Sequence, residues 1–369
     1  MNLSVKKEDL LPLLSQVQGI LEKRTNLPVL SNILLETTKK GGNLFASDSE
    51  LSFCGHFEGT VKKEGKLVTS GKKLFEIVKE LPSGDFSLNS EKNNSVRIKG
   101  HQSVFCIHGL NAEDFPVFPK FKSEDNYKVS VGDLLEVIDK TLYCVSLDES
   151  RYHLTGVFCE TLSESSSRFV ATDGHRMSFV DLASEGLQGL KGGIIIPKKG
   201  LQEVKKMIHS SEEEEMVEIS VDKPRLIFKF KNQILAVRLI EGAYPNYKLL
   251  IPKEEGREIL INREVFLSAL KRISVLTSAR FKGITFSFKN EVLTLEISQP
   301  ELGEASEQIP CKHKGDELKI RFNSQYILDI LHSIKEKEVK IILKDSLSSG
   351  VIEGQGNERY KSIVMPMKF

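Results

Sequence analysis

Along the chain, the spacing of hydrophobic residues changes repeatedly between a pattern typical of strands and a pattern typical of helices. Short runs in which apolar and polar residues alternate, typical of half-buried strands, lead into runs with apolar residues three or four positions apart, typical of amphipathic helices. In one of them, Leu134, Leu135 and Ile138 lie on one helical face. The predicted helices span 6–24, 71–82, 133–146, 198–209, 263–276 and 324–338.

The order of these elements repeats three times. Leu74, Leu201 and Ile327 occupy equivalent positions about 126 residues apart, close to a third of the 369-residue chain. A chance likeness between amphipathic helices would explain any one pair but not a constant period. Extended, proline-containing segments, LNAEDFPVFPKF and LIEGAYPNYKLLIP, end the first two repeats.

Each repeat carries two helices and about eight short strands. Such a unit buries its core by packing helices on one face of antiparallel sheets, which is an α+β fold. We therefore expect three similar domains in a row, at residues 1–120, 128–250 and 253–369.

Composition narrows the choice of function. With 40% hydrophobic and 28% charged residues and a net charge of +1, the chain is neither a disordered protein nor a strongly basic DNA-coating protein. A locally basic surface stays possible, because the predicted helices hold a small excess of lysine and arginine, as at Lys198 and Lys199. Plain solvation is the alternative interpretation for any single lysine.

The five cysteines are odd in number and form no CxxC pair, which argues against a disulfide framework and a zinc site. The start of the chain lacks a secretory pattern, and no apolar run is long enough to cross a membrane. We therefore expect a cytoplasmic protein without a metal or a cofactor.

One cluster, ATDGHRM at 171–177, could carry chemistry. Asp173, His175 and Arg176 could form the acid–base site of an enzyme such as a phosphodiester hydrolase. In the alternative interpretation, Asp173 bonds the backbone of a tight turn and His175 lies at the surface. Motifs of serine hydrolases, nucleotide-binding loops and zinc peptidases are absent from the sequence.

Several longer motifs resemble those of one family, the bacterial sliding clamps that are the beta subunits of DNA polymerase III. The resemblance runs from end to end, and its motifs occur in the family's order. They are RYHLTGV at 151–157, FVATDGHRMS at 169–178, IIPKKGLQEV at 195–204, YPNYKLLIP at 244–252, FKG at 281–283, FNSQYILDIL at 322–331 and IVMPMKF at 363–369.

The resemblance implies a non-catalytic processivity factor with the DNA clamp fold. Two three-domain chains would join head to tail in a homodimeric ring around double-stranded DNA. The implied partners are the catalytic subunit of DNA polymerase III, the clamp loader, and other polymerases and repair proteins that bind through short peptide motifs. No membrane is implied.

The resemblance also implies three sets of site residues. The pocket for partner peptides would comprise Leu154, Thr172, Gly174, His175, Arg176, Met177, Pro245, Leu250, Phe281, Asn323, Tyr326, Leu347, Ser349, Ile363, Val364, Met365, Pro366 and Met367. DNA would meet Arg24, Tyr152, His153 and Lys198, and the dimer would join Leu81, Phe105 and Ile107 of one chain to Val275 and Leu276 of the other.

The sequence departs from the family pattern at three positions in or near these sets. Leu249 stands where arginine is usual, Phe369 where leucine is common, and His153 where tyrosine is usual. Peptide preference and the contact to DNA could differ accordingly. Besides the hydrolase, a peptide-binding adaptor that does not encircle DNA is the alternative function.

Overall fold

The computed structural model describes residues 1–21, 27–119, 126–183, 192–252, 256–278, 280–313 and 315–368. The chain forms two compact units, Met1–Leu135 with Lys199–Leu239 and Glu136–Lys198 with Ile240–Phe369. The middle repeat therefore contributes to both units. Within the described ranges, no helix has the length and apolar character needed to span a membrane.

The first unit contains a five-stranded and a nine-stranded antiparallel sheet. The smaller sheet has the order β5 (Thr60–Lys63), β1 (Asn2–Lys6), β7 (Asp85–Ser90), β8 (Val96–Gly100) and β9 (Ser103–Ile107). The larger has the order β10 (Gly109–Leu110), β6 (Lys66–Ser70), β2 (Asn32–Thr38), β3 (Gly41–Ser47), β4 (Leu51–Glu58), β18 (Gln233–Arg238), β17 (Arg225–Phe230), β16 (Met216–Asp222) and β11 (Asn126–Ser130).

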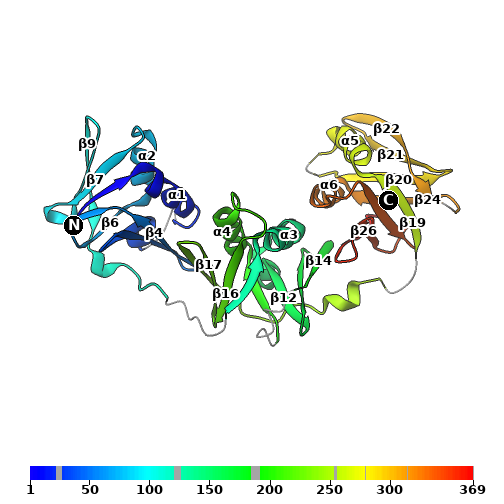
Figure 1. Ribbon diagram of the computed structural model, residues 1–369. Coiled ribbons are helices and arrows are strands. Elements are labelled where there is room, and N and C mark those ends of the chain that lie inside the picture. The colour runs from blue at the N-terminus through cyan, green and yellow to red at the C-terminus, as the bar shows by residue number, and fades with distance from the viewer. Residues whose placement is uncertain are drawn as a thin grey trace. The chain divides into compact units, whose positions relative to one another are not determined.

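The nine-stranded sheet crosses the boundary between the first two repeats. Strand β4 of the first repeat pairs with β18 of the second, from Leu51 opposite Val237 to Gly55 opposite Gln233. Helices α1 (Lys7–Val17) and α2 (Gly71–Glu80) lie side by side against these sheets, as Figure 1 shows. Buried leucines such as Leu10 and Leu74 point from them into the core.

The second unit repeats this plan with a nine-stranded and a four-stranded sheet. The larger has the order β15 (Ile194–Pro197), β12 (Gly156–Ser163), β13 (Ser166–Thr172), β14 (Arg176–Ala183), β27 (Tyr360–Val364), β26 (Gly350–Gly354), β25 (Glu338–Leu343), β19 (Arg257–Asn262) and β23 (Lys312–His313). The smaller has the order β22 (Gly303–Pro310), β21 (Val292–Gln299), β20 (Gly283–Lys289) and β24 (Leu318–Asn323).

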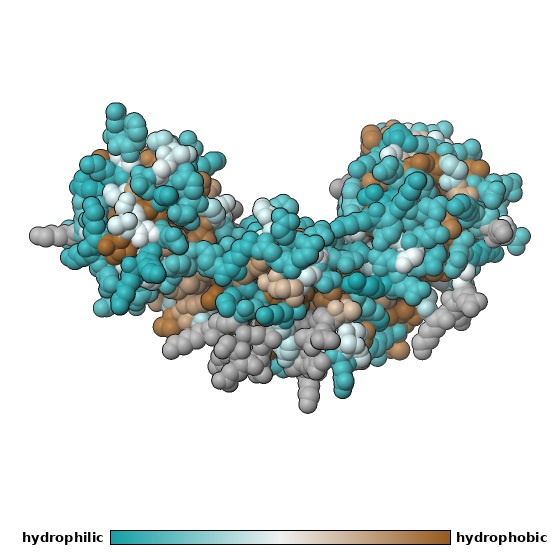
Figure 2. Space-filling view, in the orientation of Figure 1, coloured by the Kyte–Doolittle hydropathy of each residue, from teal (hydrophilic) through white to brown (hydrophobic). Residues whose placement is uncertain are grey.

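Strands β14 and β27 join the middle repeat to the third, with Met177 opposite Ile363. Helices α5 (Arg263–Ile273) and α6 (Ser324–Ser333) pack against each other, and α5 also contacts β21 and β22. In the view of Figure 2, hydrophilic residues cover most of the surface and hydrophobic residues form separate patches.

The predicted α+β fold and the direct passage from strand to helix are confirmed. The remaining helices are α3 (Val131–Thr141) and α4 (Lys198–Ile208), and the side chains of Ser70, Asn262 and Asn323 cap α2, α5 and α6. The predicted helix ends were wrong, because each helix is shorter than expected. The chain leaves the α-helical conformation after Thr141 for a 3-10 turn, and after Ser333 it must reach β25.

Candidate functional site

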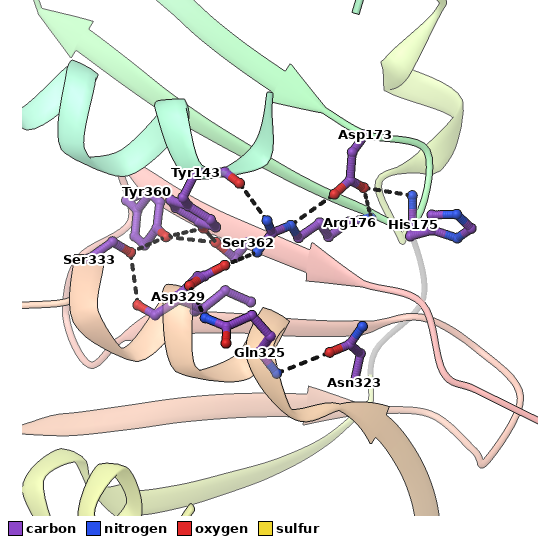
Figure 3. Close-up of polar contacts among 11 residues, drawn as sticks. Tyr143, Asp173, His175, Arg176, Asn323, Gln325, Asp329, Ser333, Tyr360 and Ser362 are labelled. Carbon is purple, nitrogen blue, oxygen red and sulfur yellow. Dashed lines mark hydrogen bonds and ion pairs between the residues drawn. The ribbon is translucent and has the colours of Figure 1, made fainter. Parts of the chain in front are cut away.

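The ATDGHRM segment forms the turn between β13 and β14. Asp173 Oδ1 accepts hydrogen bonds from the backbone N–H groups of His175 and Arg176, at 2.9 and 3.0 Å. Gly174 has a φ of 91°, a left-handed conformation that other residues adopt at a cost. The His175 side chain is exposed, and its ring points away from Arg176 in Figure 3. The turn interpretation of Asp173 is therefore confirmed.

Arg176 uses its guanidinium as a structural link. Its Nε donates to Asp173 Oδ2 at 3.0 Å, Nη1 donates to Asp329 Oδ2 at 2.6 Å, and Nη2 donates to the Tyr143 carbonyl at 2.5 Å. Its Cζ also lies 4.3 Å from the centroid of the Tyr326 ring. Arg176 thus joins the turn on the middle repeat to α6 on the third, as Figure 3 shows.

These contacts contradict the acid–base alternative. Asp173 directs its oxygens to backbone N–H groups and to Arg176, so it does not orient the His175 ring. A general base needs such an orienting partner to hold its tautomer and direction. Asp173 therefore does not play the part that the hydrolase interpretation gave it.

Four hydroxyl groups form a second link between the middle and third repeats. The Tyr360 hydroxyl lies 2.7 Å from that of Tyr143, 2.6 Å from that of Ser333 and 2.7 Å from that of Ser362. Ser333 also donates to the carbonyl of Ile330 at 2.8 Å. Because every hydroxyl in this buried hydroxyl cluster has partners, its desolvation is compensated.

The hydroxyl cluster predicts a loss of stability at alkaline pH. Burial raises the pKa of Tyr360 to about 12 and that of Tyr143 well above its usual range. The unfolded chain ionises its tyrosines near a pKa of about 10. Their contribution is therefore complete below about pH 10 and is lost as pH rises toward about 12.

This expectation can be checked by denaturant unfolding at about pH 8 and about pH 11. The free energy of unfolding should fall in the wild type and fall less in Tyr360→Phe. Tyr152→Phe, which removes the hydroxyl of an exposed tyrosine, should behave like the wild type. Equal pH dependence in all three proteins would contradict the prediction.

The predicted C-terminal tail lies beside the turn. Met365 N–H donates to the His175 carbonyl at 3.0 Å, and Met367 N–H donates to the Arg321 carbonyl at 2.7 Å. The Met365 and Met367 side chains are 43% and 39% exposed, so they offer apolar surface to a partner. The structure thus brings the ATDGHRM turn and the apolar tail together, as the resemblance implied.

A cavity of about 530 Å³ lies next to this tail. Its floor includes Ile342, Val351 and Ile363, which occupy one register row on β25, β26 and β27. Leu250 and Ser349 of the predicted pocket also line it. A row of aliphatic side chains under an open cavity suits the apolar side chains of an extended peptide.

The other predicted pocket residues fall into three groups by burial. The buried ones are Leu154, Thr172, Met177 and Val364, the partly buried ones include Phe281, Asn323, Tyr326 and Pro366, and the exposed ones include Pro245 and Leu347. Leu249, the departure from the family pattern, is 75% exposed at the rim of the cavity.

Asp329 and Tyr143 are the site residues that sequence reasoning missed. The signal for Asp329 was a single acid inside the apolar helical run YILDIL. Arg151 was missed as well, although its Nη1 would lie 2.7 Å from a Cβ at position 174. A side chain in place of Gly174 would therefore meet both backbone strain and this guanidinium.

The residues expected to touch DNA differ in exposure. Tyr152 is 56% exposed and makes an edge contact with the His153 ring, with centroids 5.6 Å apart. Lys198 is partly buried, and burial together with the Arg176 charge lowers its pKa. Arg24 lies outside the described residues, as does Phe369.

The residues expected at the dimer contact also differ in how exposed they are. Leu81 is only 5% exposed and packs close to Gly100 within its own repeat, so it offers little surface in the single chain. Phe105 is 37% exposed on β9, and Val275 is 78% exposed directly after α5. Ile107 and Leu276 are partly buried.

The described residues contain no group of three or more metal-ligating side chains, and the five cysteines are free thiols. The folded arrangement defines a class of protein. It has three repeats of paired helices on antiparallel sheets and an apolar groove where the middle and third repeats share a sheet. A groove of this kind is typical of proteins that bind an extended peptide.

Comparison with known proteins identifies the family. Residues 1–119, 128–246 and 248–368 match the models of the N-terminal, central and C-terminal domains of the DNA polymerase III beta subunit. The Caulobacter vibrioides beta sliding clamp is 29% identical over the whole length of both chains, and that of Pseudomonas aeruginosa is 28% identical.

Solved structures agree over the full chain. The Pseudomonas aeruginosa beta subunit superposes with a TM-score of 0.92 at 28% identity, and a Bartonella birtlesii clamp bound to griselimycin superposes with a TM-score of 0.95 at 27% identity. The Caulobacter crescentus clamp, with a TM-score of 0.93 at 28% identity, holds polyethylene glycol at what is described as its beta-motif tethering region. All three cover 100% of both chains.

The chain belongs to the family of DNA polymerase III beta subunits. It is therefore a sliding clamp, which supplies processivity to the polymerase as a non-catalytic subunit.

Proposed function

We propose that two copies of this chain join head to tail around double-stranded DNA, and that the groove beside the C-terminal tail tethers partner proteins by short peptides. The partners are the polymerase III catalytic subunit, the clamp loader, and other polymerases and repair proteins. The protein works in the cytoplasm, with domains at the limits expected from the sequence, 1–120, 128–250 and 253–369. The observation that supports this assembly concerns two strands, one in each unit, that lie at the edge of a sheet and have a neighbouring strand on one side only among the described residues.

The first edge is β9, the outermost strand of the five-stranded sheet. Val104 and Phe105 on this strand are 52% and 37% exposed. An exposed, apolar edge strand is a surface that other chains can extend, and stable proteins normally cover it. A partner chain that pairs with β9 would bond the free backbone groups of this edge and cover its exposed apolar side chains.

The second edge is β22, the outermost strand of the four-stranded sheet. It packs against the 3-10 turn Ser274–Leu276, where Val275 is 78% exposed. An apolar residue beside an unpaired edge therefore occurs in both units. Since β9 and β22 belong to different repeats, their pairing is head to tail, and a two-chain assembly of this kind closes into a ring.

The groove suits extended peptides with leucine or phenylalanine anchors. Ile363 and Val351 supply a buried floor, and Leu250 adds exposed apolar surface to the lining. Leu347 and Met365, close in sequence to the lining residues Ser348 and Ile363, are exposed as well. Flexible methionine side chains adapt to different anchors. We assign the peptide contacts to the pocket residues that the resemblance implied, with Asp329 and Tyr143 holding Arg176 in place.

Contact with DNA is assigned to Arg24, Tyr152, His153 and Lys198. The ring must surround the duplex without binding it tightly, because strong binding to phosphates would oppose sliding. Several helix cations are already neutralised, such as Lys206 by Glu203 and Arg272 by Glu307. This pairing supports weak attraction rather than tight binding.

Topological retention tests the proposal. Protein loaded on nicked circular DNA should stay bound, and cutting the circle should release it at once, because a sliding ring leaves through an open end. An adaptor that binds peptides without encircling DNA would show no retention on the circle. Equal retention before and after cutting would contradict encirclement, and a particle image without a hole wide enough for a duplex would do the same.

A further inference from the structure

Helix α4 has a basic face that continues to the residue after the helix. The exposed and partly exposed positions follow one another three or four residues apart, as they do along one side of a helix. They are Lys198, Lys199, Gln202, Lys205, Lys206 and His209. Lys198 is already proposed to contact DNA, so its neighbours on this face can attract phosphates as well.

A hollow of about 780 Å³ lies between this face and helix α1 of the first repeat. Ser15 and Gln16 line it from α1, and Lys205, Lys206 and His209 line it from the side of α4. All of these residues belong to the first compact unit. Two lysines beside one hollow would attract a DNA phosphate strongly if nothing compensated their charges.

A buried glutamate supplies such compensation. The Glu203 side chain is only 4% exposed, and its Oε1 lies 2.7 Å from Nζ of Lys206, whose side chain is 51% exposed. Gln16 Nε2 donates to the Glu203 carbonyl at 2.9 Å and to Oε2 at 3.4 Å. Each carboxylate oxygen of Glu203 therefore has a partner, one on α4 and one on α1, which fixes the position of the negative charge.

Gly19, just after α1, leaves room for this ion pair. A Cβ at position 19 would overlap Glu203 Oε1 and lie 2.5 Å from Lys206 Nζ, too close for real atoms. The contact between the first and middle repeats is therefore shaped around the pair. Lys199, on the same basic face, is paired in a similar way with Asp48 of the first repeat, whose side chain is 2% exposed.

We infer that Glu203 sets an upper limit on the attraction of α4 for DNA, because it holds a fixed negative charge next to Lys206. This inference rests on the proposed function, since it presumes that DNA passes α4. An exposed acid could turn away from its lysine when a phosphate approaches, whereas Glu203 is buried and held by Gln16. Weak contacts to phosphates let the ring slide, while its closure keeps it on the duplex.

Binding of the full-length protein to a short fluorescent duplex at different salt concentrations tests the inference. Glu203→Gln preserves the shape of the side chain and an acceptor for Gln16, but it frees the charge of Lys206. The slope of the logarithm of the dissociation constant against the logarithm of the salt concentration should steepen by up to about 0.9 per chain, the value of one phosphate contact. At low salt the variant should bind about threefold more tightly than the wild type.

Two further variants separate the charge of Glu203 from its place in the fold. The double variant Glu203→Gln/Lys206→Gln should return to the wild-type slope, because it removes both charges of the pair. Glu218→Gln is the matched control, since Glu218 pairs with Lys229 at 3.0 Å on strands β16 and β17 of the same unit. It removes the same charge from a sheet and should leave the slope unchanged. Circular dichroism verifies that all variants are folded.

Three results would overturn the inference. They are a wild-type slope and affinity in Glu203→Gln, a double variant that stays as steep as Glu203→Gln, and an equal change in Glu218→Gln. If the wild type binds the duplex too weakly to measure, binding gained by Glu203→Gln alone supports the inference, and no gain contradicts it. A wild type that is not retained on circular DNA would instead contradict the proposed encirclement.

Discussion

Replacing Arg176 with alanine should lower the free energy of unfolding by about 3–5 kcal/mol. The side chains of Arg176, Asp173 and Asp329 are only 10%, 16% and 24% exposed, so the substitution leaves two carboxylates in a poorly solvated place without their counter-ion. The Tyr143 carbonyl also loses its donor. Urea unfolding followed by circular dichroism measures the effect.

Arg272→Ala is the control for this prediction. Arg272 also pairs with a glutamate, Glu307, but its side chain is 61% exposed, so water replaces the lost contact. Its loss should cost no more than about 1 kcal/mol. Equal destabilisation by the two substitutions would show that Arg176 is not a special link between the repeats.

Replacing Arg176 with alanine should also weaken peptide binding. Arg176 holds the turn against α6, and it stacks on Tyr326 of the proposed pocket. Without it, the turn on the middle repeat loses this attachment to α6 on the third repeat. The affinity for an anchored peptide should fall at temperatures where the variant is still folded.

Replacing Val275 with aspartate should raise the dissociation constant of the dimer at least 100-fold. The residue is 78% exposed in the single chain, so the substitution costs the fold little. In the proposed dimer it lies against β9 of the other chain, where a carboxylate would be buried without a partner. Such burial costs several kcal/mol, and about 2.7 kcal/mol already corresponds to a factor of 100.

Sedimentation or light scattering across a dilution series would measure this change. Val117→Asp is the matched control, because Val117 is 96% exposed in the segment that ends the first repeat. The control should stay dimeric and should be retained on circular DNA. A Val275→Asp protein that dimerises like the wild type would place the contact elsewhere.

The repeat could be predicted from the sequence because helices and strands have local periods. Apolar residues three or four positions apart predict the position of α2, and the residue that caps this helix, Ser70, directly precedes it. The helix ends were harder to predict, since α6 ends at Ser333 and the chain then continues to β25, which begins at Glu338. Tertiary packing decides such ends.

The contacts that build the site are distant along the chain. Arg176 and Asp329 are separated by 153 residues, and Tyr143 and Tyr360 by 217. No local pattern marks such pairs, so the resemblance could suggest Arg176 but not the acid that holds it. The same reason explains Leu81, whose burial depends on packing against Gly100.

The pairing of β4 with β18 and of β14 with β27 limits how this protein can be divided. A middle repeat cut out at its sequence limits would carry β14 and β18 as bare edges, with their backbone N–H and C=O groups open to other chains. We expect such a fragment to aggregate even though its sequence reads as a self-contained unit. The sequence is thus built from single repeats, but we expect the smallest fragment that stays soluble to contain more than one repeat.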